Sequence, residues 1–293
     1  MIKITTDSTC DLPSSLLEKY DITVIPLGIV KAGKLYRDGV DIRTADIAAH
    51  VDAGGEITTT NAVNAADYET VFREMTARYD AVIHLNIGMG FSSCYQNAKL
   101  AAEEVPEVYV VDSQNLSVGH GWLVLAAAEA AKDGKSVGEI LSLLEDLTPR
   151  VEISFVLDRL DYMKKGGRCS AVTALGANLL KLHPCIEVIS GRMGVTKKYR
   201  GSMEKVVADY VRDRVATRSD IDRHRVFLVD SCRTPGIQET ARRVLEECGV
   251  PSVIFDGDQT DPRLFSEAQY ETRIQALAEM MAENKAKKGR AAQ

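Results

Sequence analysis

A single stretch, residues 81–102, constrains the fold more than any other part of the chain. It reads AVIHLNIGMGFSSCYQNAKLAA: an apolar run typical of a buried parallel strand, a turn with Gly88, Gly90, Ser92 and Ser93, and a helical pattern. Because the first N–H groups of a helix are unpaired, this geometry predicts an anion-binding turn, to which the serine hydroxyls add donors. The alternative, that Ser92 or Ser93 only caps the helix, stays open at this point.

The same order of strand and helix recurs through the first half of the chain. Strand patterns at residues 2–6, 22–27 and 108–112 alternate with helical ones. This alternation is typical of a doubly wound parallel sheet, with a ligand crevice at the carboxyl ends of its strands. A β-hairpin is also predicted at residues 31–38. We expect four polar segments to meet in the crevice: Asp7–Cys10, Thr59–Asn61, Gly88–Ser93 and Asp112–Ser117.

The pattern changes near residue 150, where we place a domain boundary. Residues 1–150 are predicted to form the N-terminal α/β domain, and residues 151–293 a second α/β domain with a mixed sheet. The second domain carries a basic glycine turn that includes Lys165 and Arg168. Its other predicted elements include a strand at 151–156 and helices at 171–182 and from residue 264 onward.

The composition excludes several classes of function. The chain has 293 residues, 45% of them hydrophobic, and a formal net charge of −6. These values are typical of a globular protein and do not favour nucleic acid as a partner. No apolar run approaches the ~18 residues of a membrane span, and no leader pattern precedes the first strand, so the expected location is the cytoplasm.

Motifs of common enzyme classes are absent from the sequence. It contains neither a G-x-S-x-G elbow nor a G-x-x-x-x-G-K-[ST] loop, and its five histidines do not pair at metal-ligand spacing. We therefore expect no metal and no cofactor. His84, which lies inside a predicted strand, is interpreted as a hydrogen-bonded core residue. Anion-binding turns without a catalytic group favour a binding protein over an enzyme.

Two cysteines nevertheless leave an enzymatic alternative open. The six cysteines include no C-x-x-C pair, so we interpret them as reduced thiols. Cys10 and Cys94 lie in predicted strand-to-helix turns, where a helix N-terminus lowers the pKa of a thiol. The alternative to a binding protein is a small acyl- or phosphoryl-transfer enzyme that uses one of them as its nucleophile. The sequence identifies no base beside either thiol.

Five segments, in order, resemble the DegV family of proteins. Residues 7–13, DSTCDLP, resemble the D-S-x-x-D-L-P opening of that family, and residues 87–95, IGMGFSSCY, resemble its I-S-S-G-L-S-G-T-Y. Residues 160–170, LDYMKKGGRCS, are similar to L-x-Y-L-K-K-G-G-R-I-S. The remaining two are TTNAV at 59–63, against T-S-Q-P-S, and VDS followed by G-x-G between 111 and 121.

The resemblance implies a two-domain α/β protein that binds a long-chain fatty acid between its domains and is not itself a catalyst. In such proteins a threonine and a serine of the N-terminal domain hold the carboxylate, here Thr59 or Thr60, and Ser92 with its neighbour Ser93. Hydroxyls and helix-end N–H groups are suited to this task. The resemblance also implies presentation of the fatty acid to the catalytic subunit of a fatty acid kinase. Arg168 and Lys165 would then contact the partner or a phosphate, and transient contact with a membrane is compatible with this function.

The chain departs from the family pattern at three points. Residues 60–63 replace S-Q-P-S, Gly88-Met89 replaces S-S, and Ser93-Cys94 replaces G-T, which changes the walls near the expected head group. After residue 255 the chain reads DGDQTDPRLFSEAQYE where the family has an H-T-G-P-G-like segment. No partner-facing histidine is assigned there, so we expect lipid binding to tolerate this change better than kinase coupling.

Overall fold

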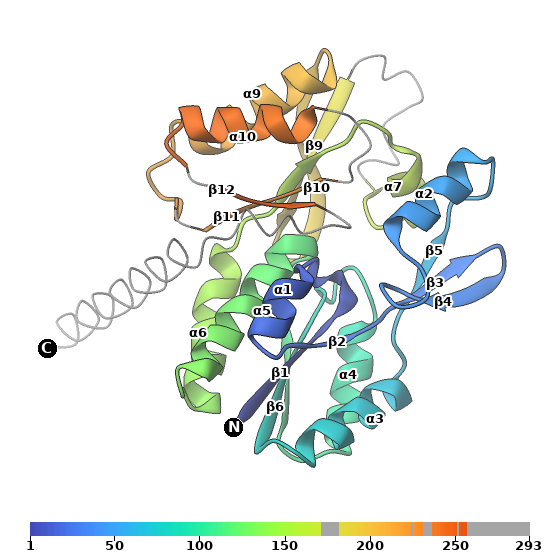
Figure 1. Ribbon diagram of the computed structural model, residues 1–293, viewed down its shortest axis with the longest axis vertical. Coiled ribbons are helices and arrows are strands. Elements are labelled where there is room, and N and C mark those ends of the chain that lie inside the picture. The colour runs from blue at the N-terminus through green and yellow to red at the C-terminus, as the bar shows by residue number, and fades with distance from the viewer. Residues whose placement is uncertain (171–181, 224, 231–235, 251, 257–293) are drawn as a thin grey trace, which may run out of the picture.

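The computed structural model describes residues 1–170, 182–223, 225–230, 236–250 and 252–256 (Figure 1). Three sequence predictions lie outside these residues. They are the helix at 171–182, of which only Leu182 is described and begins a strand, the helix from residue 264, and the altered segment after Asp256.

A four-stranded parallel sheet forms the centre of the N-terminal half, with the strand order β2-β1-β6-β7. All six residues of β6 are buried, because helices cover both faces of the sheet. The predicted doubly wound parallel sheet is therefore confirmed. Its strands are β1 (Ile2–Asp7), β2 (Thr23–Ile25), β6 (Ala81–Asn86) and β7 (Val108–Asp112).

Two groups of helices cover the sheet from opposite sides (Figure 1). On one side α3 (Ala65–Thr76) and α4 (Cys94–Glu103) contribute to a single apolar cluster. On the other side lie α1 (Ser14–Lys19), α5 (Ser117–Lys132) and α6 (Val137–Leu147). Helix α5 is apolar on nearly every face, as expected for a helix packed between the sheet, α6 and a strand of the C-terminal half. Two short 3-10 helices, η1 (Ser8–Cys10) and η2 (Thr148–Arg150), complete this half.

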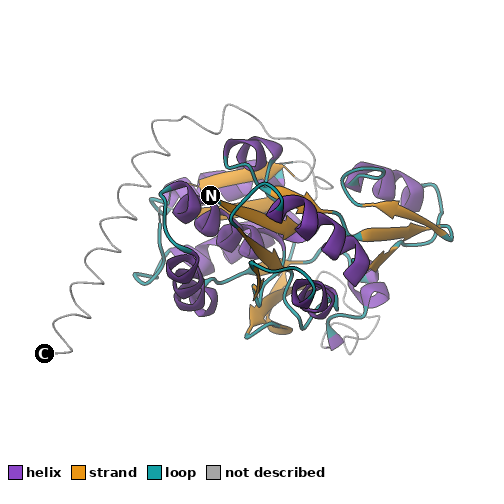
Figure 2. Cartoon of the chain, turned by 90° about the horizontal axis from the view of Figure 1, so that it is seen from below, coloured by secondary structure: helices purple, strands orange, loops and turns teal. Residues whose placement is uncertain are grey.

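A small antiparallel sheet of order β4-β3-β5 projects from the central sheet, with α2 (Thr44–Asp52) beside it (Figure 2). The predicted hairpin is confirmed, and its two-residue turn has Ala32 and Gly33 at φ 49° and 76°, the positive values that a type I′ turn needs. The placement of Thr59–Asn61 at the parallel-sheet edge was wrong. These β-branched threonines begin a strand that pairs with β3 instead. The strands are β3 (Gly28–Lys31), β4 (Lys34–Arg37) and β5 (Thr59–Asn61).

Strands of both directions are present in the C-terminal half, as a mixed α/β architecture requires. Three strands form an antiparallel sheet of order β10-β9-β8, and two others form a parallel pair. The strand predicted at 151–156 is shorter and covers β8 (Ser154–Val156). The other strands are β9 (Leu182–Ile189), β10 (Arg192–Arg200), β11 (Val226–Asp230) and β12 (Ser252–Asp256). The helices are α7 (Asp161–Gly166), α9 (Met203–Val215) and α10 (Ile237–Glu247).

No helix within the described ranges combines the length and the apolar character needed to cross a bilayer.

Candidate functional site

Three of the four polar segments expected in the crevice do meet at the carboxyl edge of the parallel sheet. The backbone N–H of Gly88 donates to the carbonyl of Asn115 at 2.8 Å. The N–H of Met89 donates to Oδ1 of Asp112 at 2.9 Å. The third segment joins them through Asp7, described next. The fourth, Thr59–Asn61, lies in the small antiparallel sheet.

Asp7 ends β1 inside a fully buried polar cluster. Its Oδ1 accepts a hydrogen bond from the Tyr68 hydroxyl at 2.6 Å, and its Oδ2 accepts from Asn86 Nδ2 at 3.1 Å and from the Ile87 N–H at 3.0 Å. His84 Nε2 lies 3.5 Å from Asp7 Oδ1. With both oxygens engaged inside the protein, this carboxylate stabilises the edge of the sheet and is not presented to a ligand.

Histidines surround this cluster and set its electrostatics. Burial is the largest single effect and raises the pKa of Asp7. The interactions with His84, His120 and the Tyr68 hydroxyl together lower it by more, so the pKa lies below its ordinary value. His84 is fully buried, with Thr5 Oγ1 2.8 Å from Nδ1 and Asn86 Nδ2 3.0 Å from Nε2. The interpretation of His84 as a hydrogen-bonded core residue is confirmed.

The turn between β6 and α4 carries the two predicted serines. Ser92 Oγ accepts from the backbone N–H of Cys94 at 3.2 Å and lies 3.1 Å from the Cys94 sulfur, so this hydroxyl caps the first turn of α4. Ser93 is exposed and its side chain makes no cap. A thiol is a weak acceptor, so the Ser92 hydroxyl can turn from Cys94 to a stronger acceptor at little cost.

Two segments of the C-terminal half close against this turn. A Cβ atom at Gly90 would fall inside van der Waals contact of the carbonyl oxygen of Gly191, at the tip of the β9–β10 hairpin, so only glycine fits. Arg168 donates from Nε to the carbonyl of Phe91 at 3.4 Å, and from Nη1 to the carbonyl of Gly166 at 2.6 Å. The basic turn predicted from the sequence thus lies next to the serine turn.

The small sheet is tied to the same region. Asn97 of α4 donates from Nδ2 to the carbonyl of Val63 at 2.7 Å, and Val63 lies two residues beyond the end of β5. The structure therefore places the end of the strand that contains Thr59 and Thr60 against the helix whose first turn Ser92 caps, although the strand and the helix belong to different sheets.

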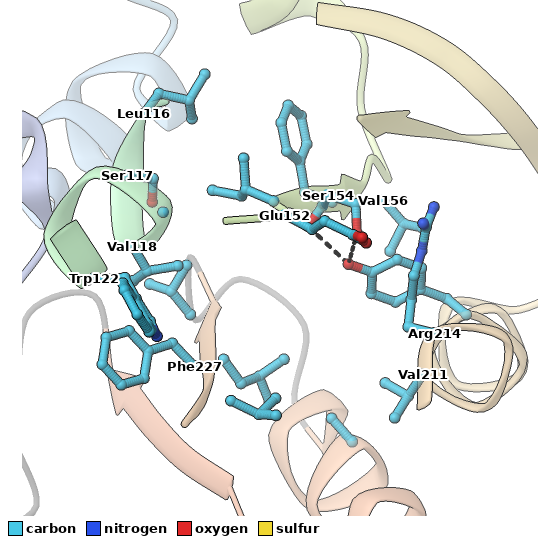
Figure 3. Close-up of a pocket in the computed structure, with 18 of the residues that line it drawn as sticks. Leu116, Ser117, Val118, Trp122, Glu152, Ser154, Val156, Val211, Arg214 and Phe227 are labelled. Carbon is cyan, nitrogen blue, oxygen red and sulfur yellow. Dashed lines mark hydrogen bonds between the residues drawn. The ribbon is translucent and has the colours of Figure 1, made fainter. Parts of the chain in front are cut away.

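A cavity of about 1210 Å³ extends between the two halves of the chain. It exceeds the roughly 300–1,000 Å³ of ordinary small-molecule pockets, and its wall is mostly apolar. Figure 3 shows Val118 and Trp122 of α5, with Phe227 of β11 beside them, and Val156 of β8 and Val211 of α9 on the opposite side of the cavity. Because it is large and mostly apolar, the cavity suits a long hydrocarbon chain.

The residues predicted to bind the fatty-acid carboxylate do not all reach this cavity. Thr60 lines it, together with Thr44 and Thr58 near the small sheet. Thr59 and Ser93 are exposed and Ser92 is half-buried, and these three are not part of the described cavity wall. Lys165 and Arg168 lie outside the described wall as well, although Tyr162 and Met163 of the same α7 segment belong to it.

The sequence analysis did not predict a buried ion pair that lies at the cavity wall. Arg225, just before β11, donates from Nη2 to both carboxylate oxygens of Glu129 in α5, at 3.1 and 2.8 Å. The two side chains are only 8% and 7% exposed, and the guanidinium carbon lies 5.1 Å from the centre of the Trp122 ring. The one available sequence signal was Glu129 itself, an acid inside the apolar run LVLAAAEAA.

Burial of the two thiols at the strand-to-helix turns counts against the enzymatic alternative. Cys10 and Cys94 are both buried, and burial raises the pKa of Cys10 to about 12 and the pKa of Cys94 above its ordinary value. The negative charge of Asp7 raises both further. A raised pKa leaves less of the reactive thiolate at neutral pH, which disfavours the enzymatic alternative. Within the described part of the chain, no cluster of three His, Cys, Asp or Glu side chains is placed to bind a metal.

Comparison with protein families gives one match over most of the chain. The model of the DegV family matches residues 1–254. A DegV domain-containing protein of Caldanaerobacter subterraneus is 32% identical over 257 residues, which cover 86% of this chain and 90% of that protein. Another from Clostridium acetobutylicum is 34% identical over 223 residues, or 75% of this chain and 80% of that protein.

Solved structures resemble the fold over similar lengths. A fatty-acid-binding DegV family protein from Thermus thermophilus matches with a TM-score of 0.75 and 30% identity, over 87% of this chain and 92% of that one. A stearic acid-binding protein from Eubacterium ventriosum matches with a TM-score of 0.71 and 27% identity, over 84% and 88% of the two chains.

Proposed function

The chain belongs to the DegV family, and from this premise we propose that it binds a long-chain fatty acid in the cavity between its halves. The observation that carries the proposal is the cavity itself, about 1210 Å³ in volume, apolar along its wall and bounded by threonines near the small sheet. The fatty-acid-binding relatives from Thermus thermophilus and Eubacterium ventriosum support the same ligand class.

The energetics of such a site come mainly from the acyl chain. Each methylene removed from water contributes about 0.8 kcal/mol, so about ten buried methylenes contribute roughly 8 kcal/mol before the cost of ordering the chain. The carboxylate must then be hydrogen-bonded where it leaves the apolar wall, since an unpaired buried charge would cancel this gain.

We place the carboxylate at the end of the cavity where Thr60 lies. Thr60 is the predicted head-group residue that reaches the cavity wall, and the Asn97–Val63 hydrogen bond holds the end of its strand against α4. Ser92 and Ser93 then supply hydroxyls from the start of α4, with Thr59 next to Thr60 as a further donor. The N-terminus of α4 adds a favourable dipole for an anion.

The second part of the proposal concerns the partner. Arg168 and Lys165 lie on the basic turn that packs beside the serine turn, so a phosphate transferred to the carboxylate would form close to their positive charges. We propose that the protein presents its fatty acid there to the catalytic subunit of a fatty acid kinase, in the cytoplasm, without catalysing a reaction itself. We also propose that residue 150, the end of η2, separates the two domains.

A titration with a fluorescent fatty acid, preceded by mass spectrometry of the purified protein, tests the lipid assignment. We expect co-purified fatty acid, and a loss of about 1.5–3 kcal/mol in binding, roughly 10- to 150-fold in Kd, for Thr60→Val and for Ser92→Ala. Thr59→Val and Ser93→Ala are the matched controls and should lose less. Equal affinity for all four variants and the unaltered chain would place the carboxylate elsewhere.

The kinase assignment needs a separate assay. With lipid at saturation and a fatty acid kinase catalytic subunit from the same cell, Arg168→Ala should reduce acyl phosphate formation more than it changes the lipid Kd. Arg243→Ala, which removes an exposed arginine paired with Glu247 on α10 and outside the described cavity wall, is the control. Unchanged acyl phosphate formation in Arg168→Ala would contradict the proposed role.

A further inference from the structure

The cavity reaches from one side of the molecule to the other. Its wall includes Thr60 of β5 and Arg218, which lies in the connection between α9 and β11. Figure 1 shows β5 on the right of the view and this connection, in orange, on the left. The two residues therefore mark opposite ends of the cavity. With the carboxylate at Thr60, the methyl end of a bound acyl chain points towards the segment that carries Arg218.

Two carboxylates from different segments hold the Arg218 guanidinium. Nη1 and Nη2 donate to the two oxygens of Glu152, at 2.6 and 2.9 Å. Nε and Nη2 donate to the two oxygens of Asp220, at 2.9 and 2.6 Å. Such forked pairs fix a guanidinium more firmly than a single contact does. Because Glu152 lies just before β8, this group of three side chains, the Arg218 clamp, ties two separate segments of the cavity wall together.

Solvent exposure shows that the Arg218 clamp lies where the cavity meets water. The side chains of Glu152 and Asp220 are 62% and 66% exposed, whereas that of Arg218 is 25% exposed. All three nevertheless line the cavity. Val215 and Ile221, which flank Arg218 in the sequence, line it as well, so apolar wall continues up to the clamp. The clamp is thus a charged boundary between an apolar interior and the solvent.

A charged boundary limits how far an acyl chain can extend. Each methylene that moves from water into the apolar part of the cavity should tighten binding about four-fold. A methyl end that presses against the clamp must instead displace the water that solvates two carboxylates, which is unfavourable. Affinity should therefore rise with chain length until the methyl end reaches the clamp, and then stop rising.

We propose that Arg218 determines chain-length specificity: the clamp closes the end of the cavity opposite Thr60 and sets the longest acyl chain that the protein binds well. The inference rests on the proposed binding of a fatty acid with its carboxylate at Thr60, and it adds the residue that limits the chain. Arg150 provides a contrast on the same wall. It pairs with Asp146, four residues earlier in the chain, so its ion pair stays within one segment.

A series of saturated fatty acids, from dodecanoic to docosanoic acid, tests the inference on the unaltered chain. Each acid competes against a fluorescent fatty acid. We expect Kd to fall about four-fold for each added methylene up to a limiting length, and then to level off or rise. Binding that tightens steadily through the longest acid would overturn the inference alone. A protein that binds no acid of the series would overturn the proposed function and this inference with it.

Variants of the clamp assign the limit to Arg218. In Arg218→Ala the two exposed carboxylates are free to turn into water, so the limit should move to a longer acid, with about four-fold tighter binding for each further methylene. Arg150→Ala is the matched control and should keep the original limit.

A second variant keeps the test independent of the folding of the first. Glu152→Ala removes a largely exposed side chain and leaves Arg218 held by Asp220 alone, so it should move the limit in the same direction. An unchanged limit in Arg218→Ala, folded by circular dichroism, would contradict the assignment, as would an equal shift in Arg150→Ala. If Arg218→Ala does not fold, an unchanged limit in Glu152→Ala refutes the proposal.

Discussion

Substituting His120 with glutamine should change how the stability of the protein depends on pH. His120 is fully buried in α5, where Nε2 donates to the carbonyl of Leu85 at 3.1 Å and lies 3.0 Å from Thr6 Oγ1. Nδ1, the nitrogen that a second proton would occupy, has no partner among the described residues. Burial, the larger effect, lowers the pKa of His120 to about 4, against opposing contributions from Asp7 and from backbone carbonyls.

The sign and the size of the effect follow from this pKa. Above pH 6.5 the imidazole is neutral in both folded and unfolded chains and contributes no pH dependence. As the pH falls from 6.5 towards 4, the unfolded chain binds a proton that the folded protein does not, so stability declines by about 1.36 kcal/mol per pH unit. Between pH 7.5 and 4.5 the unaltered protein should therefore lose about 2.7 kcal/mol through this one group.

Urea unfolding at several pH values, followed by the fluorescence of the single tryptophan, measures this loss. Trp122 lies two residues from His120, so it reports on the same helix. His120→Gln should be less stable than the unaltered protein at pH 7.5, by about 1–3 kcal/mol, and the difference should shrink by about 2.7 kcal/mol at pH 4.5. Other groups that titrate in this range are present in both proteins, so their contribution cancels in the difference. A difference that stays constant between pH 7.5 and 4.5 would refute the reasoning.

Three further outcomes test the structure. Gly90→Ala should destabilise the protein by about 1–3 kcal/mol in urea unfolding, because the added Cβ meets the Gly191 carbonyl. Gly138→Ala is the control: its Cβ meets nothing within 4 Å, so it should be neutral or stabilising by up to about 1 kcal/mol. Equal effects of the two substitutions would contradict the close approach at Gly90. Tyr68→Phe removes a buried hydrogen bond to Asp7 and should lower the free energy of unfolding by about 1.5–3 kcal/mol. Tyr79→Phe removes a hydrogen bond to the exposed Asp21 and should lower it by less than about 0.5 kcal/mol. A Tyr68→Phe protein as stable as the unaltered one would show that Asp7 does not need this donor. Cys10 and Cys94 should react with iodoacetamide at pH 8 far more slowly than in the urea-unfolded chain, as measured by mass spectrometry; rapid alkylation of either in the folded protein would restore the enzymatic alternative.

The sequence by itself determined the parts of the fold that local patterns specify. The apolar run of β6, the Gly/Ser turn and the start of α4 lie within one stretch of 22 residues, and the periodicity of each is independent of the rest of the chain. The hairpin at Ala32 and Gly33 is equally local, because positive φ values at two adjacent turn residues are enough to reverse the chain. Parallel pairing of the central strands follows from their alternation with helices.

Tertiary structure alone decided which strand Thr59–Asn61 would join and which thiols would be reactive. A three-residue extended segment is compatible with a turn at one sheet or a strand in another, and its partner β3 lies about 30 residues earlier in the chain. A helix N-terminus lowers a thiol pKa only where burial and a nearby carboxylate do not outweigh it, and at Cys10 both do.

The pairing of Arg225 with Glu129 shows the same limit most clearly. The two residues are 96 positions apart, on a helix of one half and at the start of a strand of the other. No local pattern marks an arginine as buried, because arginine is normally exposed and its burial depends on finding a counter-charge. Whether the two side chains meet depends on the angle at which two distant elements pack, which periodicity along the chain does not encode.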